Sequence, residues 1–173
     1  MITTLNKFKL INEQLENNKF KKWFKNSKVT KNNNPLIVYH GSRSIFNIFK
    51  PSKNYGNQGE TDQIEGIYFT DSKDGASFFT LTDDEKYLNA VYLSMQNPYI
   101  VDNYNDLKKD LNIITLKNVN KILKSKGYDG IIMNKGFYSN GGPYKLFLVF
   151  EPNQIKSINN NGTWDVNNND IYS

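Results

Sequence analysis

Residues 35–43, PLIVYHGSR, place side chains that can hold a polar ligand directly after an apolar run typical of a β-strand. His40 is the only histidine and Arg43 the only arginine in the 173 residues. At the end of a strand the ring nitrogens of His40 can hydrogen-bond a ligand, Gly41 lets a ligand approach the backbone, and the forked guanidinium of Arg43 suits a phosphate. A histidine there is also a common structural hydrogen bonder, and the strand-end position predicts little contribution to packing.

A second stretch, EGIYFTDSKDGASFF (residues 65–79), carries two aromatic rings eleven residues apart. Tyr68 follows a glycine in a predicted strand, and Phe79 lies in a short predicted helix. Asp71 or Ser72 can cap this helix. Two rings placed in this way can enclose a planar ligand by stacking. Either ring alone is also a normal core residue, so the spacing leaves both interpretations open.

The elements around these motifs predict an α+β domain, because strands and short helices alternate at irregular intervals. Apolar residues at helical spacing predict one or two helices over residues 5–24, and residues 50–65 form a polar surface loop. Strands are predicted at residues 36–40, 66–70, 90–95, 129–134, 145–151 and 155–159, and further helices at 104–111 and 116–126. Trp164 and Ile171 are expected to hold the low-complexity tail against the body.

The charge of the chain is concentrated at its N-terminus. Residues 1–34 carry eight lysines against Glu13 and Glu16, a net +6, whereas residues 35–173 carry 14 basic and 15 acidic side chains, a net −1. We therefore expect a basic helical N-terminal segment over 1–34 and a main domain over 35–173, together one globular unit. A basic segment suits an anionic partner such as nucleic acid, although a solvated amphipathic helix has the same composition.

The composition excludes several kinds of chemistry. The chain has no cysteine and one histidine, so disulfides, thiolate catalysis and a soft-ligand metal site are excluded, and no metal is expected. No stretch approaches the roughly 18–20 apolar residues of a membrane span, and the N-terminus lacks the apolar core of a signal peptide. We expect a cytoplasmic protein with no membrane partner.

Together the two motifs resemble the NAD-binding signature of ADP-ribosyltransferases, on the branch typified by diphtheria toxin and the poly(ADP-ribose) polymerases. The matching residues are HGSR, then GIYF, then an aromatic ring eleven residues after the tyrosine. Over about residues 20–172 the chain is most similar to the ADP-ribosyltransferase modules of phage polyvalent proteins and related bacterial toxins. The matching stretches are WFKNSKV, NPLIVYHGS, GIYFTDS, GYDGII and VFEPNQIKSINNNGTWD. The resemblance implies a catalytic domain of two packed mixed β-sheets that form an NAD cleft, with flanking helices.

The resemblance also assigns roles to residues near the first motif. It implies that His40 hydrogen-bonds a ribose hydroxyl of NAD and that the backbone of Gly41 meets the nicotinamide amide. Ser42 would make a further contact with that amide. Ala76 stands where the polymerases have a serine that bonds the carboxamide, so that contact is not expected here.

Other implied contacts come from the second motif and the loop before it. Tyr68 and Phe79 would sandwich the nicotinamide ring of NAD. Arg43, or a lysine of the 50–65 loop, would meet the pyrophosphate, whose two negative charges need donors.

One residue of the family pattern is missing. These enzymes commonly carry a glutamate at the start of a late strand, within a pattern like EYVVF-x-P-x-QIKS, whereas this chain reads LFLVFEPNQIKS with Leu146 in the glutamate's place. In the family's chemistry that glutamate holds a ribose hydroxyl, stabilises the oxocarbenium-like transition state and polarises the nucleophile. Some members that transfer a single unit carry an aliphatic residue there and rely on an acidic group of the target.

Other carboxylates are candidates for the missing group. Glu151 is five positions further along the strand, about 16 Å away and too far to substitute. The loop residues Glu60, Asp62 and Glu65 precede the Tyr68 strand and are the alternative, although acidic residues in a polar loop are normally only solvated.

The leading interpretation is a mono-ADP-ribosyltransferase whose catalytic positions are His40, Tyr68 and Leu146. It would cleave NAD at the nicotinamide–ribose bond and transfer ADP-ribose to a protein or nucleic acid in a bacterial host cell, as a toxin, phage factor or defence effector. A cognate antitoxin or immunity protein is an expected partner. Two alternatives remain open: a catalytically silent NAD or ADP-ribose binding module, and a nucleic-acid-binding accessory domain whose aromatic residues are core.

Overall fold

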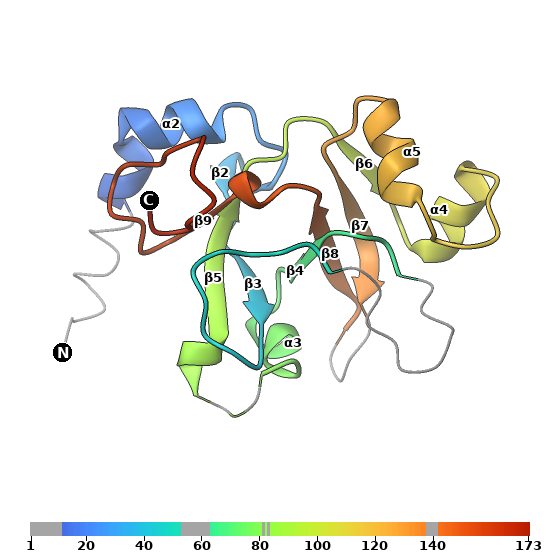
Figure 1. The fold of residues 1–173 in the computed structure, drawn as a ribbon, viewed down its shortest axis with the longest axis horizontal. Helices are drawn as coiled ribbons and strands as arrows, with labels where there is room; N and C mark the ends of the chain where they lie inside the picture. The colour runs from blue at the N-terminus through green and yellow to red at the C-terminus, as the bar shows by residue number, and fades with distance from the viewer. Residues whose placement is uncertain (1–11, 53–62, 81, 83, 138–141) are drawn as a thin grey trace.

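A computed structural model describes residues 12–52, 63–80, 82, 84–137 and 142–173 of the chain (Figure 1). Residues 12–16 are helical, and the helices after them are α2 (Asn18–Phe24), α3 (Lys73–Ser77), α4 (Tyr104–Asp110) and α5 (Val119–Ser125). Two 3₁₀ turns are η1 (Glu85–Tyr87) and η2 (Pro152–Gln154). Within the described ranges, no helix is both long and apolar enough to cross a membrane.

The strands follow the predicted order, with three additions. They are β1 (Thr30–Lys31), β2 (Asn34–Pro35), β3 (Val38–Gly41), β4 (Ile67–Thr70), β5 (Leu88–Leu93), β6 (Pro98–Val101), β7 (Gly130–Phe137), β8 (Tyr144–Val149) and β9 (Ile155–Ser157). The additions are β6 and the β1–β2 ribbon. Pro98 favours a turn when the sequence is considered alone, but proline is also tolerated at the first position of an edge strand, which is where it stands.

Seven strands form one mixed sheet in the order β6-β7-β8-β4-β3-β5-β9, and β1 and β2 form a separate ribbon. The strands β6 and β7 are parallel, and the other neighbours are antiparallel. The α+β architecture agrees with the prediction. The expected pair of packed sheets is corrected to one large sheet. Its strands fall into two groups, β6-β7-β8-β4 and β3-β5-β9, and the single residue pair Tyr39 and Thr70 joins the groups by connecting β3 to β4.

Alternate side chains of the sheet enter two apolar clusters. The central cluster combines both groups of strands, with Val38 and Val91 from β3 and β5 and Phe69 and Phe147 from β4 and β8. The helix-side cluster lies on the other face of β7 and β8, beneath α4 and α5. Because side chains alternate along a strand, neighbouring residues of β4 and β8 belong to different clusters.

A third cluster joins the N-terminal helix to the C-terminal tail. Phe20 and Trp23 of α2 pack with Tyr92 of β5 and with Trp164 of the tail, and the ring centroids of Phe20 and Trp164 are 4.8 Å apart. Trp164 is 2% exposed, and Ile171 is 1% exposed in the central cluster. The prediction that these two residues hold the tail is confirmed.

Candidate functional site

His40 lies near the C-terminal end of β3 and bonds to the backbone of β4. Its Nδ1 is 2.7 Å from the carbonyl oxygen of Tyr68. A carbonyl oxygen can only accept, so Nδ1 carries the proton and the neutral ring keeps Nε2 as an acceptor. This tautomer suits a ligand that donates a hydroxyl proton, such as a sugar.

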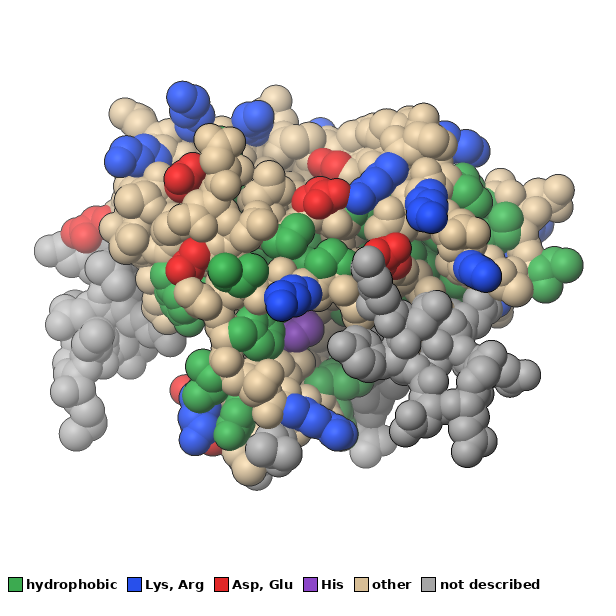
Figure 2. Space-filling view, viewed as in Figure 1, with side chains coloured by type: hydrophobic (Ala, Val, Ile, Leu, Met, Phe, Trp, Pro, Cys, Tyr) green, Lys and Arg blue, Asp and Glu red, His purple; other side chains and the backbone are tan. Residues whose placement is uncertain are grey.

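Three phenylalanine rings surround the His40 ring. The distances between ring centroids are 5.0 Å to Phe49, 5.5 Å to Phe69 and 6.2 Å to Phe46. The histidine still reaches the surface of the face shown in Figure 2, where it is purple. The expectation of little packing at this position is therefore wrong, because the loop after β3 folds Phe46 and Phe49 back against the ring.

This environment makes the charge of His40 sensitive to pH. Burial lowers the pKa of His40 below its ordinary value of 6.5, and the hydrogen bond to Tyr68 offsets part of that effect. The unfolded chain therefore takes up a proton before the folded chain does, so stability that is present above about pH 6.5 is lost as the pH falls through 6.5 toward the folded pKa. Below the pKa of His40 in the folded protein, Nε2 is protonated, so a ligand that needs it as a hydrogen-bond acceptor no longer binds.

We expect the imidazole NMR signal of this protein, which has one histidine, to titrate with a midpoint below 6.5. Binding of a ligand at Nε2 should weaken over the same range, since a protonated nitrogen cannot accept. His40→Asn is the matched control, because it removes the only imidazole: the signal should disappear, and the pH profile of ligand binding should flatten. A midpoint at or above 6.5 would show that the ring is solvated or faces an anion.

The C-terminal tail holds the loop that supplies Phe46 and Phe49. Asn47 of that loop donates its Nδ2 hydrogen to Oδ2 of Asp170 at 2.6 Å, and its carbonyl accepts from the Ile171 amide at 2.9 Å. The buried Lys156 in turn donates from Nζ to the carbonyl of Asp170 at 2.9 Å. The tail thus positions the wall around His40. Sequence reasoning missed these contacts, since no local signal connects residues that are more than 100 positions apart.

Gly41 packs directly against the end of α3. A Cβ atom on Gly41 would lie 1.9 Å from the carbonyl oxygen of Ala76 and 3.2 Å from Cβ of Phe79. The close contact between β3 and α3 therefore requires a residue without a side chain at position 41. This contact brings Phe79, whose side chain is 54% exposed, beside the His40 strand. Ser72 caps the start of α3, and its hydroxyl accepts from the Gly75 amide at 2.9 Å.

The ring of Tyr68 points away from the face of β4 that carries Phe69. It packs against the helix-side cluster, and its hydroxyl donates to the carbonyl of Ile64 at 2.6 Å. Burial, reinforced by the nearby Tyr104, holds the pKa of Tyr68 well above its ordinary value. The hydroxyl therefore stays protonated, and His40 and Tyr68 meet through the Tyr68 backbone.

The two residues after Gly41 differ in their environment. Ser42 is buried, its amide donates to the carbonyl of Tyr87 at 2.9 Å, and its hydroxyl donates to the carbonyl of Ser44 at 2.5 Å. Arg43 is exposed to solvent. Ser42 thus stabilises the turn after β3, while Arg43 is available to an anion.

Leu146 is covered rather than open to solvent. It is 8% exposed, belongs to the helix-side cluster, and pairs with Thr70 on one side and Met133 on the other. An irregularity in β7 between Met133 and Phe137 lays the Gly136 backbone over it, so that a Cβ on Gly136 would be 2.5 Å from Cβ of Leu146. The position where the family pattern has a glutamate is apolar and closed here.

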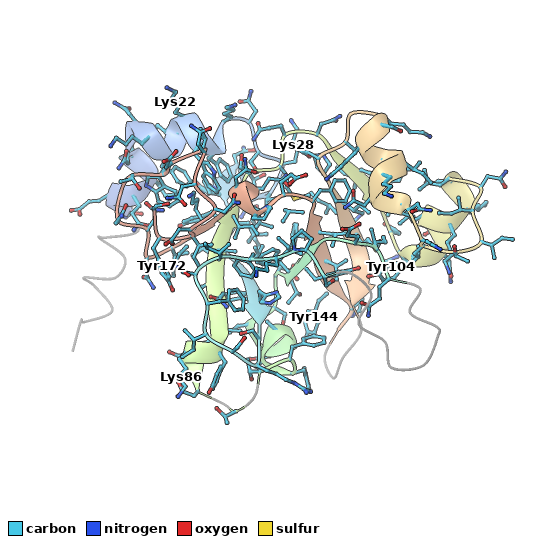
Figure 3. All side chains as sticks on the ribbon, viewed as in Figure 1. Lys22, Lys28, Lys86, Tyr104, Tyr144 and Tyr172 are labelled. Atoms are coloured by element: carbon cyan, nitrogen blue, oxygen red, sulfur yellow. The ribbon has the colours of Figure 1, made fainter. Side chains whose placement is uncertain are left out.

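The start of β8 lies against α3. The Asp71 carboxylate accepts from the Lys145 amide at 3.1 Å, and Tyr144 lies beside α3, 3.3 Å from where a Cβ of Gly75 would stand (Figure 3). Asp71 is therefore next to the residue that precedes Leu146. The sequence offered Asp71 only as a possible helix cap.

The structure describes two of the other four candidate carboxylates, Glu65 and Glu151. Glu60 and Asp62 lie outside the described residues, and Glu65 is half-buried ahead of β4. Glu151 is 2.5 Å from Nζ of Lys124 on α5, on the helix side of the sheet. In the described ranges, no three His, Cys, Asp or Glu side chains gather as a metal site would require.

Two surface hollows lie elsewhere on the molecule. One, of about 380 Å³, is lined by Trp23 and Tyr128 among others, and the second, of about 390 Å³, by Tyr39 and Tyr172 among others. His40 and Phe79 line neither of them, so the NAD cleft stays a prediction.

Comparison with protein families accounts for this combination of motifs. The α+β architecture with a large mixed sheet is consistent with the resemblance to ADP-ribosyltransferases. The chain belongs to the family of ADP-ribosyltransferases in polyvalent proteins, whose model matches residues 30–165. The match includes every predicted site residue, whereas α2 and residues 166–173 lie outside it. No curated protein gives a significant match to the chain.

Proposed function

We propose that this domain binds NAD at the C-terminal end of β3 and transfers one ADP-ribose unit to a macromolecular target. The observation that carries the proposal is the neutral His40 ring, held by the Tyr68 carbonyl so that Nε2 can accept from a ribose hydroxyl. Membership of an ADP-ribosyltransferase family supports NAD as the substrate. We place this activity in the cytoplasm, as that of a toxin-like or phage-derived effector.

Neighbouring residues are assigned to the rest of NAD. Phe79, exposed beside Gly41, would stack on the nicotinamide ring, and the Gly41 backbone would meet its amide. Arg43 is exposed and would pair with the pyrophosphate. The Tyr68 ring, which packs on the helix side of β4, would contribute by holding the backbone that orients His40.

The buried Leu146 determines which acceptor is favoured. In the transfer, the bond between nicotinamide and the ribose C1′ breaks, nicotinamide leaves with the bonding electrons, and an acceptor oxygen bonds to C1′. Chain growth needs a ribose hydroxyl to be deprotonated, and such general-base assistance contributes about 10²–10⁴-fold. A leucine cannot supply it. A carboxylate or terminal phosphate of the target is already anionic and needs no base.

The test is incubation with labelled NAD and separate pools of protein, RNA and DNA, followed by intact-mass analysis of the labelled pool. We expect nicotinamide release and a single ADP-ribose increment per site. A ladder of increments would contradict the proposal, because it would require a base that activates the ribose hydroxyl. His40→Asn protein serves as the control for background labelling.

A silent NAD or ADP-ribose binding module is the second candidate, and the covered position of Leu146 favours it. In that case calorimetry would show NAD binding that depends on His40, but no pool would gain label and no nicotinamide would appear. If NAD does not bind, the aromatic rings around His40 serve only as part of the hydrophobic core.

A further inference from the structure

The exposed side of α2 and the segment after it form a surface of lysines. Residues 17–34 contain six lysines and no acidic residue. Phe20, Trp23 and Phe24 are buried on one side of α2, so the lysines of the helix lie on the opposite side. We call the exposed residues Lys19, Lys21, Lys22, Lys25, Lys28 and Lys31 the lysine face. Figure 2 shows basic side chains along the upper edge over α2, where Figure 3 labels Lys22, and Lys28 is labelled further along that edge, past the end of α2.

Among the residues that the structure describes, one ion pair neutralises part of this charge. Lys21 contacts Glu16, with Nζ and Oε2 2.6 Å apart and both side chains largely exposed. Within the described residues, no carboxylate contacts the other five lysines of the face. Exposed lysines held close together repel one another, so an anion that approaches them gains attraction and relieves that repulsion.

The composition of the face distinguishes among anionic partners. The exposed large apolar residues of the described chain lie elsewhere, for example at Ile45, Phe78 and Ile114, and none lies on α2 or in residues 25–34. A stable protein–protein interface needs an apolar or aromatic centre surrounded by polar residues. A phosphate backbone needs only cations and amide donors, which lysines and the asparagines among them supply.

The position of the face also favours a long partner. In Figure 1, α2 lies at the top of the molecule, whereas α3, which packs on Gly41 beside His40, lies at the bottom. A target held at α2 must therefore extend across the molecule before it reaches His40. A continuous polyanion can do this, because its charge repeats along its whole length.

We propose that the lysine face is a docking surface for the phosphate backbone of a nucleic acid. The binding of nucleic acid is argued from the exposed lysines and does not depend on the proposed function. We also infer that the bound nucleic acid is the acceptor of ADP-ribose, and this second step rests on the proposed function. The family model matches from residue 30 onward, so five of the six lysines of this face lie outside the matched residues.

The test measures binding of fluorescently labelled RNA and DNA, single-stranded and duplex, to the full chain across about 50 to 200 mM salt. The variant replaces Lys19, Lys21, Lys22 and Lys25 with glutamine. The control replaces four exposed lysines of other elements, Lys86, Lys109, Lys117 and Lys135, and so changes the net charge equally. We expect the α2 variant to lose about tenfold or more in affinity, and the salt slope for a single strand to fall by about 3, at about 0.7 per lost phosphate contact. The control should stay near the unmodified protein.

Three results would overturn the proposal. They are equal weakening by the α2 and control variants, binding of a polyglutamate peptide as tight as that of the nucleic acid, and absence of nucleic-acid binding at low salt. NAD binding by calorimetry is measured on the same variants and should be unchanged. If the unmodified protein does not bind NAD, the proposed function is wrong, whereas the docking of nucleic acid on the lysine face is still tested by the α2 and control variants.

Discussion

Replacement of His40 by asparagine is expected to lower NAD affinity by about 10- to 100-fold, and transfer by at least as much, while the protein stays folded. The asparagine amide can still donate to the Tyr68 carbonyl, which lies 2.7 Å from Nδ1 in the structure. It has no atom at the position of Nε2, so a buried ribose hydroxyl would lose its acceptor, which costs about 1–3 kcal/mol. Calorimetry with NAD measures the affinity, and a thermal melt shows whether the variant stays folded.

His40→Gln and His40→Ala complete this test. Glutamine can place an acceptor near the Nε2 position but gives up the bond to Tyr68, so it should retain more NAD binding than asparagine and less stability. Alanine leaves a cavity among Phe46, Phe49 and Phe69 and should lower the melting temperature as well. If asparagine leaves both NAD binding and transfer intact, His40 is only a structural hydrogen bonder.

Replacement of Leu146 by glutamate is expected to destabilise the protein by about 3 kcal/mol and to give no gain in NAD cleavage. The family pattern alone suggests the opposite, namely that a restored glutamate would speed the reaction. In the structure, however, the side chain is 8% exposed beneath the Gly136 backbone and packs in the helix-side cluster. A carboxylate there would lose its hydration without gaining a partner.

Leu146→Met and Leu146→Gln are the matched controls. Methionine conserves volume and should cost less than about 1.5 kcal/mol, and glutamine separates the effect of polarity from that of charge. Burial would raise the pKa of the new glutamate, so the deficit in unfolding free energy should grow as the pH rises. A stable Leu146→Glu protein that releases nicotinamide faster would show that this position opens toward the substrate.

Much of the fold was predictable because it depends on local sequence patterns. The strand before His40, the cap of α3 and the helices at 104–111 and 116–126 follow from apolar periodicity and capping residues. Gly127, with a φ of 85°, ends α5 as its position predicts, because glycine adopts that conformation at little cost. The missed β6 shows the limit, since its proline looks like a turn until a neighbouring strand pairs with it.

The candidate site also has features that the sequence predicts and features that only the folded structure decides. The order of HGSR, GIYF and the later phenylalanine is a property of the sequence, and it sufficed to indicate the ADP-ribosyltransferase family. The side of β4 that the Tyr68 ring occupies, and the covering of Leu146 by Gly136, are decided by strand register and by the irregularity in β7. These depend on pairings between distant segments, which no local propensity encodes.

The sequence by itself determined the class of the fold, the charge of its N-terminal segment and the order of motifs that indicates the family, because each follows from residue type and short-range spacing. Only the tertiary structure decided that His40 is packed and neutral, that the tail holds its loop through Asn47 and Asp170, and that the lysines of α2 lie far from His40. The physical reason is that burial and hydrogen bonding arise from contacts between different elements, 28 positions apart for His40 and Tyr68 and 123 for Asn47 and Asp170, which form only when the chain folds.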